Sequence, residues 1–180
     1  MKIAAAGVGK FEVPDWDATT QKKAREALLS LSALGGAKEN RFGRKQDVDT
    51  ISWLLGTASG WGGNPRSDAI YVPGYPAKND GKTVYRLTLK DVPVDGFWSV
   101  TVYNAEGFMF ETEQKAYSVN NVTAKRNADG AYHIQFGGNP QGVDNYLATQ
   151  AGWNYVVRLY RRRQAILDGT WKVPEPQEML

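Results

Sequence analysis

The sequence predicts a mainly β protein: a jelly-roll-like antiparallel β-sandwich preceded by two helices. Aromatic residues make up 12% of the 180 residues, together with 19 Gly and 8 Pro, and this composition is typical of strands joined by turns. From residue 68 onward, apolar residues recur with a period of two, as in half-buried strands. No helical period separates these runs, which favours antiparallel pairing over a parallel sheet.

Two helices are expected before residue 66. The first follows Pro14, with Asp15 or Asp17 as its N-cap, and its apolar residues from Ala24 to Leu34 fall three and four positions apart. The glycine pair at positions 35 and 36 ends it. The second begins at Asp47 or Asp49 and carries four large apolar residues, Ile51, Trp53, Leu54 and Leu55.

The strands follow in order, at residues 69–72, 83–90, 98–103, 117–122, 131–136 and 154–160. Pro73 is expected to stop the first strand. Turn signals at 104–107 and 127–130 predict tight turns, and the first of these is expected to lead into a returning strand at 108–110, forming a hairpin with 98–103. Residues 137–149 are expected to form a long polar loop, 161–167 a helical turn, and 171–180 an extended tail.

The predicted domain organisation places a helical region, residues 1–66, on a sandwich formed by residues 67–180, the two together making one domain. The hydrophobic fraction of 42% and the charged fraction of 23% are ordinary values for a globular chain of this length. The sequence contains neither an internal repeat nor a low-complexity segment.

Composition excludes several classes of chemistry. The chain has no cysteine, so it has no disulfide, no thiolate nucleophile and no cysteine-ligated metal. The net charge of +3 does not predict specific nucleic-acid binding. No run approaches the length of a membrane span, and the apolar stretch at residues 3–7 is too short for a signal peptide. The expected location is therefore cytoplasmic as the sequence is written, or periplasmic if a targeting segment or an upstream domain has been removed.

The chain resembles a bacterial family, domain of unknown function 1214. Four segments carry the resemblance: residues 92–107 (VPVDGFWSVTVYNAEG), 117–119 (YSV), 127–130 (NADG), and the stretch from Arg158 to Trp171. The N-terminal residues 7–11 and the helix after them fit as well, so the resemblance covers almost the whole chain. It implies a jelly-roll-like sandwich with helices at its start, usually C-terminal to a domain of unknown function 1254, and it implies no established reaction. The chain departs from the family pattern at Ala116, where relatives tend to have arginine.

Catalytic patterns are sparse. His133 is the single histidine, so it cannot form a histidine-rich metal site, and no metal or cofactor is predicted. No Gly-x-Ser-x-Gly elbow accompanies it. The glycine-rich stretches at 7–10 and 60–63 lack the spacing of a phosphate loop. A pair of carboxylates could support glycoside hydrolysis, with candidates among Asp95, Glu106, Glu111, Glu113 and Asp144.

Five residues are candidates for ligand binding: Trp61, Tyr117, His133, Asp144 and Trp153. Trp61 and Trp153 adjoin glycines in predicted loops, where exposed indole rings could stack on a sugar. A basic patch is predicted at Arg158, Arg161, Arg162 and Arg163.

Three functions follow from these observations. The first is a non-catalytic β-sandwich domain that binds a small molecule, a glycan or another protein. The second is a hydrolase acting on a carbohydrate or a related polar substrate. The third is a subunit that assembles with further copies of the chain.

Overall fold

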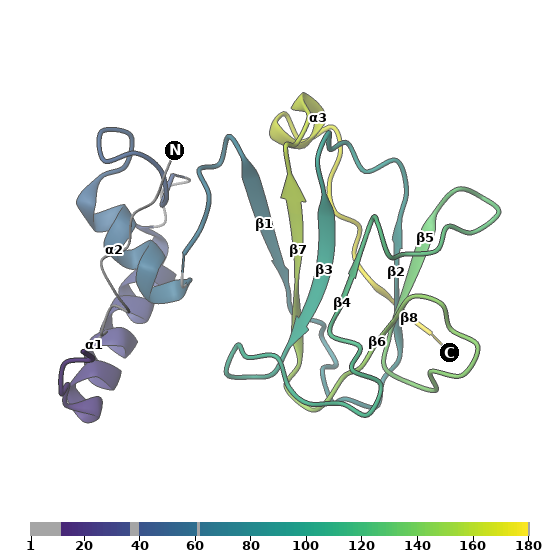
Figure 1. The fold of residues 1–180 in the computed structure, drawn as a ribbon, viewed down its shortest axis with the longest axis horizontal. Coiled ribbons are helices and arrows are strands. Elements are labelled where there is room, and N and C mark those ends of the chain that lie inside the picture. Colours follow the sequence, from purple (N-terminus) through teal and green to yellow (C-terminus); the bar gives the residue numbers. More distant parts are fainter. Residues whose placement is uncertain (1–11, 37–39, 61, 180) are drawn as a thin grey trace, which may run out of the picture. The chain divides into compact units, whose positions relative to one another are not determined.

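The computed structural model describes residues 12–36, 40–60 and 62–179. The chain divides into two compact units, a helical unit up to Gly62 and a β unit from Gly63 onward (Figure 1). That the predicted helical region packs on the sandwich stays a prediction.

The helical unit contains both predicted helices. Helix α1 spans Ala18–Leu31, and the Asp17 carboxylate caps it by accepting from the Thr20 amide. A π-helical turn, η1, continues it over Ser32–Gly36. Helix α2 spans Thr50–Ser59, capped by Asp49 through the Ser52 amide at 2.9 Å. Because a capping carboxylate satisfies an otherwise unpaired amide, these two aspartates explain where the helices begin.

The β unit contains eight strands among the described residues. They are β1 (Ala69–Gly74), β2 (Tyr85–Leu89), β3 (Trp98–Tyr103), β4 (Ser118–Asn120), β5 (Tyr132–Phe136), β6 (Tyr146–Leu147), β7 (Asn154–Tyr160) and β8 (Gln177–Glu178), with the short helix α3 (Gln164–Leu167) after β7.

The strands form two four-stranded sheets, one in the order β1-β7-β3-β4 and the other in the order β6-β5-β2-β8. All pairs are antiparallel except β5 with β6, which is parallel. The prediction of a mainly β, antiparallel-dominated sandwich is therefore confirmed. Its jelly-roll connectivity stays a prediction.

The core lies between the two sheets and follows the predicted alternation. In β2, Tyr85, Leu87 and Leu89 are buried, while Arg86 is exposed. In β7, Tyr155, Val157 and Leu159 are buried. Side chains of a strand point to opposite faces in turn, so the period of two read from the sequence identifies the core face of these strands.

The predicted hairpin at residues 98–110 is wrong. The turn exists, with the Asn104 amide donating to the Phe108 carbonyl at 2.8 Å, but residues 108–110 form no strand. The antiparallel partners of β3 are β7 and, farther along the chain, β4. A turn signal fixes only the local reversal of the chain, whereas the choice of partner strand depends on which segment completes the sheet.

Three smaller expectations also need correction. The period of two predicts that Ser99 and Thr101, which alternate with Trp98, Val100 and Val102, face solvent, but they are only 6% and 7% exposed. The loop predicted at 137–149 contains strand β6, whose Leu147 is fully buried. Pro73 does not stop the first strand, because β1 is an edge strand that runs on to Gly74 and an edge tolerates a missing amide.

Candidate functional site

The predicted ligand-binding residues do not form one site. Trp61 lies outside the described residues. Tyr117 is half-buried, and its carbonyl accepts from the Val102 amide at 3.1 Å. The Asp144 carboxylate is exposed and pairs with the Lys125 ammonium at 2.6 Å. Within the described residues, no hydrogen bond or ion pair joins any two of the candidates.

His133 lies on the outer side of strand β5, as the alternation predicts. Its Nδ1 is 3.0 Å from the Thr88 hydroxyl, and its Nε2 is 3.4 Å from an Asp129 carboxylate oxygen. The hydrogen bond from the Ala131 amide, which outweighs the opposing effect of desolvation, keeps the pKa of Asp129 below its usual value. These contacts orient the imidazole at the surface of the sheet.

The expectation that Trp153 is exposed is wrong, because its side chain is 0% exposed. Its indole stacks on Phe136, with ring centroids 5.0 Å apart, and also contacts Tyr85 and Tyr155. Gly152, with φ +81°, reverses the chain directly before β7, so the side chain that follows the turn enters the core rather than the solvent. Trp153 is thus a core residue.

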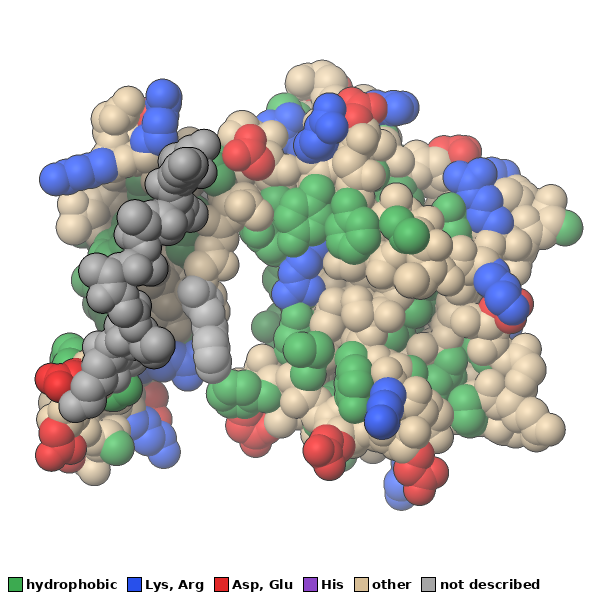
Figure 2. Space-filling model, viewed as in Figure 1, with side chains coloured by type: hydrophobic (Ala, Val, Ile, Leu, Met, Phe, Trp, Pro, Cys, Tyr) green, Lys and Arg blue, Asp and Glu red, His purple; other side chains and the backbone are tan. Residues whose placement is uncertain are grey.

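Three arginines of the predicted basic patch, Arg158, Arg162 and Arg163, have different partners, and the fourth, Arg161, is exposed. Arg158 lies in β7, where its guanidinium donates to the Tyr103 hydroxyl and also lies 6.0 Å from the ring centroid of Tyr71. Arg162 donates to the Arg66 carbonyl, and Arg163 pairs with Asp95 at 2.7 Å. Figure 2 shows hydrophobic and basic side chains over β1, β7 and β3, which is the sheet that carries Arg158.

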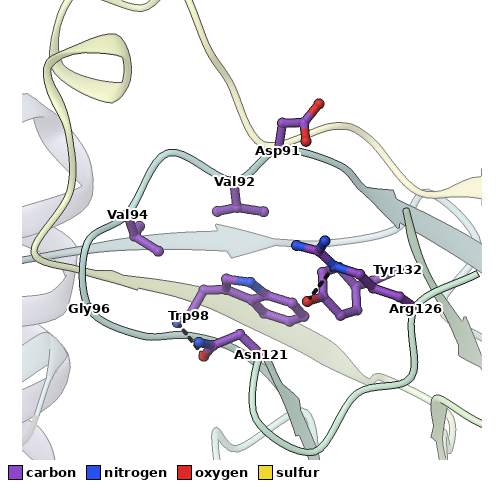
Figure 3. Close-up of a pocket in the computed structure, with 8 residues that line it drawn as sticks. All are labelled: Asp91, Val92, Val94, Gly96, Trp98, Asn121, Arg126 and Tyr132. Atoms are coloured by element: carbon purple, nitrogen blue, oxygen red, sulfur yellow. Dashed lines mark hydrogen bonds between the residues drawn. The ribbon is translucent and has the colours of Figure 1, made fainter. Parts of the chain in front are cut away.

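A pocket of about 200 Å³ opens beside the start of β3 (Figure 3). We call it the Trp98–Arg126 pocket. Its lining comes from the loop between β2 and β3, from β3 itself, from the loop after β4, and from β5: Asp91, Val92, Val94, Gly96, Trp98, Asn121, Arg126 and Tyr132.

Hydrogen-bond donors dominate the polar groups of this pocket. Arg126 donates its Nε to the Tyr132 hydroxyl at 2.9 Å, which leaves both terminal guanidinium nitrogens without an acceptor in the described part of the chain. The Asn121 side-chain oxygen accepts from the Trp98 amide at 3.1 Å, so its amide nitrogen remains as a donor. The Trp98 indole nitrogen likewise has no acceptor among the described residues, and Figure 3 shows it on the ring edge nearer Val92.

The two charged groups of the pocket are oriented differently. Figure 3 shows the Arg126 guanidinium reaching across the pocket over Tyr132, whereas the Asp91 carboxylate points away from it. The guanidinium carbon lies 5.2 Å from the ring centroid of Tyr132. No ion pair links Arg126 to a carboxylate of the described residues. A cation held over an aromatic ring and left unpaired can receive an oxyanion.

Apolar surface forms the rest of the pocket. Trp98 is 3% exposed and packs edge-on against Tyr132, with ring centroids 5.0 Å apart. Val92 and Val94 are half-buried and pack against the same core. The pocket therefore combines an apolar wall with a small group of converging donors, a combination typical of small-molecule sites.

The wall formed by Val92 and Val94 is fixed by the segment after β7. The Asp95 amide donates to the Arg161 carbonyl at 2.8 Å, and the Arg163 amide donates to the Pro93 carbonyl at 2.8 Å. Val94 pairs with Arg162 in an isolated antiparallel bridge. The arginine run thus fastens this loop, chiefly through its backbone.

The opposite wall, which carries Arg126, is fixed by Asn145. This side chain is 3% exposed. It accepts from the Lys125 amide at 2.8 Å and donates to the Lys125 carbonyl at 2.8 Å and the His133 carbonyl at 3.1 Å. Internal hydrogen bonds therefore hold the backbone of both walls.

Part of this site lies in a segment that the sequence already marks. Residues 92–107, which carry the family resemblance, contribute Val92, Val94, Gly96 and Trp98 to the pocket. Arg126 and Asn121 were missed because each is one polar residue in a loop, and their approach to Trp98 follows only from the pairing of β3 with β4.

Two further observations concern metals and membranes. Across the described ranges, no three His, Asp or Glu side chains are grouped so that they could hold a metal ion. Of the helices in those ranges, none combines the length and the apolar character that a membrane crossing requires.

Comparison with known proteins places the chain in a family. The family model described as "Protein of unknown function (DUF1214)" matches residues 74–164. The chain belongs to this family. All eight residues lining the Trp98–Arg126 pocket fall inside the region that matches DUF1214.

A solved structure agrees with the fold of this DUF1214 chain. It is similar to the VPA0106 protein from Vibrio parahaemolyticus, with 25% identity and a TM-score of 0.67 over 93% of this chain and 47% of that one. A putative uncharacterized protein from Burkholderia cenocepacia aligns with 18% identity and a TM-score of 0.45 over 92% of this chain and 42% of that one. The chain spans less than half the length of either. No curated protein matches it.

Proposed function

We propose that this domain is a non-catalytic binding module that takes a small organic carboxylate in the Trp98–Arg126 pocket. The observation that carries the proposal is the convergence of three N–H donors without acceptors in the described structure, on Arg126, Trp98 and Asn121, at one apolar pocket. Arg126 is exposed and Asn121 is half-buried, so these donors are accessible to a ligand, and a ligand oxyanion would act as their common acceptor.

A carboxylate suits these donors better than a neutral group does. The planar guanidinium presents paired donors that match the two oxygens of a carboxylate, and the terminal nitrogens of Arg126 are available for this contact. The ligand's charge would also balance the one unpaired cation of the pocket.

The size and the walls limit the rest of the ligand. A volume of about 200 Å³ corresponds to roughly six or seven water molecules at liquid density. Val92, Val94 and the Trp98 ring would contact a short aliphatic or aromatic body. The apolar wall therefore favours an organic carboxylate over inorganic phosphate, which has no apolar part.

The test is a calorimetric titration with benzoate and butyrate, with benzamide as the neutral isostere of benzoate. Hydrogen bonds to a charged group contribute about 1.5–3 kcal/mol, so Arg126→Gln is expected to weaken benzoate binding by roughly ten- to a hundredfold. Arg86→Gln is the matched control, because Arg86 is an exposed arginine in β2 outside the pocket.

Three results would contradict the proposal: no binding of either carboxylate at millimolar concentration, equal binding of benzamide and benzoate, or equal loss in the two arginine variants. Inorganic phosphate binding as tightly as benzoate would contradict the role of the apolar wall.

The other predicted functions stay predictions. Of the carboxylates considered for hydrolysis, Asp95 is paired with Arg163 and Asp144 with Lys125. Turnover of any compound in a panel of glycosides and esters would support the hydrolase. Light scattering that reports a dimer or larger species would support assembly.

A further inference from the structure

A second pocket, on a different part of the β unit, has the opposite electrostatic character. It has a volume of about 410 Å³. Three tyrosines line it, with two prolines, one alanine and two glutamates beside them: Tyr75, Tyr85, Tyr155, Pro76, Pro176, Ala77, Glu175 and Glu178. We call it the tyrosine pocket. None of its lining residues belongs to the Trp98–Arg126 pocket.

Tyr155 provides the floor of the tyrosine pocket. Its side chain is 5% exposed, and its ring lies so close to Gly74 that a Cβ there would come within 2.3 Å of the hydroxyl oxygen. Within the described residues, that hydroxyl makes no hydrogen bond. Burial, and after it the charge of Glu175, raise the pKa of Tyr155 to about 12, so the phenol is neutral at physiological pH.

The two glutamates are not equivalent. Both carboxylate oxygens of Glu178 accept hydrogen bonds from the Lys78 ammonium, at 2.8 and 2.9 Å. Among the described residues, Glu175 has no ion pair. One negative charge is therefore balanced and the other is not, and the pocket as a whole is electronegative.

We infer that the tyrosine pocket is a second binding site, for a small organic ammonium ion. The faces of tyrosine rings attract cations, and the unpaired carboxylate of Glu175 supplies the counter-charge beside them. The free hydroxyl of Tyr155 accepts an N–H from a primary ammonium group. The negative charge of Glu175 would repel an anion, and a neutral ligand would not balance this charge.

The test uses a charged ligand and a neutral one of the same size. Benzylamine, protonated at pH 7, and benzyl alcohol are titrated into the protein by calorimetry. Benzylamine is expected to bind at least tenfold more tightly than benzyl alcohol. Glu175→Gln is expected to reduce this preference at least fivefold, whereas Glu113→Gln, at an exposed position outside the pocket, is expected to leave it unchanged.

A second variant tests the hydrogen bond separately. Tyr155→Phe keeps the ring and is expected to weaken benzylamine several-fold while leaving the affinity for choline, which has no N–H, within twofold. An unchanged benzylamine affinity in this variant would overturn the role of the hydroxyl. Equal binding of amine and alcohol, no amine binding at millimolar concentration, or no effect of Glu175→Gln would overturn the site.

Failure of the amine site can be distinguished from failure of the proposed carboxylate site. Arg126→Gln is expected to leave benzylamine binding intact, and Glu175→Gln is expected to leave benzoate binding intact. If Arg126→Gln abolished benzylamine binding, the assignment of the amine to the tyrosine pocket would be overturned.

Discussion

Replacing Trp153 by alanine tests the packing that the whole β unit depends on. The indole is 0% exposed and contacts the rings of Phe136, Tyr85 and Tyr155, so its removal leaves a cavity between the two sheets. Truncation of a buried Trp to Ala costs about 3–5 kcal/mol. The whole free energy of unfolding of a typical domain is about 5–15 kcal/mol, so a large share of the stability would be lost.

Urea unfolding followed by circular dichroism measures this loss. With a urea dependence of about 2 kcal/mol per molar, the midpoint is expected to fall by roughly 1.5–2.5 M in Trp153→Ala. Met109→Ala is the control, because Met109 is 62% exposed in the same unit, and exposed substitutions change stability by about 0.5 kcal/mol or less. A Trp153→Ala midpoint within 0.3 M of the unmodified chain, on the order of 0.6 kcal/mol at this slope, would refute the placement of Trp153 in the core.

Three further predictions concern the walls of the two pockets. Asn145→Ala removes three hydrogen bonds and is expected to lower the free energy of unfolding by about 1–3 kcal/mol. Because these bonds hold the loop that carries Arg126, we also expect several-fold weaker benzoate binding. Unchanged stability and unchanged benzoate affinity would refute this prediction. Gly74→Ala would place a Cβ 2.0 Å from the Tyr155 ring, so we expect a lower melting temperature and weaker benzylamine binding. Gly107→Ala meets no atom within 4 Å but is strained by its φ of +87°, and it is expected to lower the melting temperature less than Gly74→Ala does and to leave benzylamine binding unchanged. The pKa of Tyr155 is raised from 10 to about 12, so the stability contributed by its protonated phenol is complete below pH 10 and is lost as the pH rises to 12. Between pH 9 and pH 12, the urea midpoint should therefore fall less in Tyr155→Phe than in the unmodified chain.

Local signals in the sequence predicted most of the secondary structure. Asp17 and Asp49 mark the helix starts because a short carboxylate side chain can satisfy the first free amides. The period of two in β2, β5 and β7 predicted which side chains are buried, because one face of each strand must cover the core. These features depend on neighbours within a few positions of the same segment.

These local signals could not predict which distant segments pair or pack together. Residues 108–110 have the same apolar character as a returning strand, yet β4 takes that place beside β3. Trp153 follows a glycine turn, as an exposed loop residue could, but Phe136 from the other sheet covers it. Arg126 and Trp98 are 28 positions apart, and only the assembled sandwich brings them to one pocket.

The most direct test of the central claim, carboxylate binding in the Trp98–Arg126 pocket, is a two-dimensional NMR titration of the ¹⁵N-labelled chain with benzoate. The account predicts saturable shifts of the Trp98 indole N–H and of the amides of Asn121 and Arg126, with the signals of Tyr155 and Glu175 unchanged. Shifts confined to other parts of the chain, or no shifts at millimolar benzoate, would contradict it.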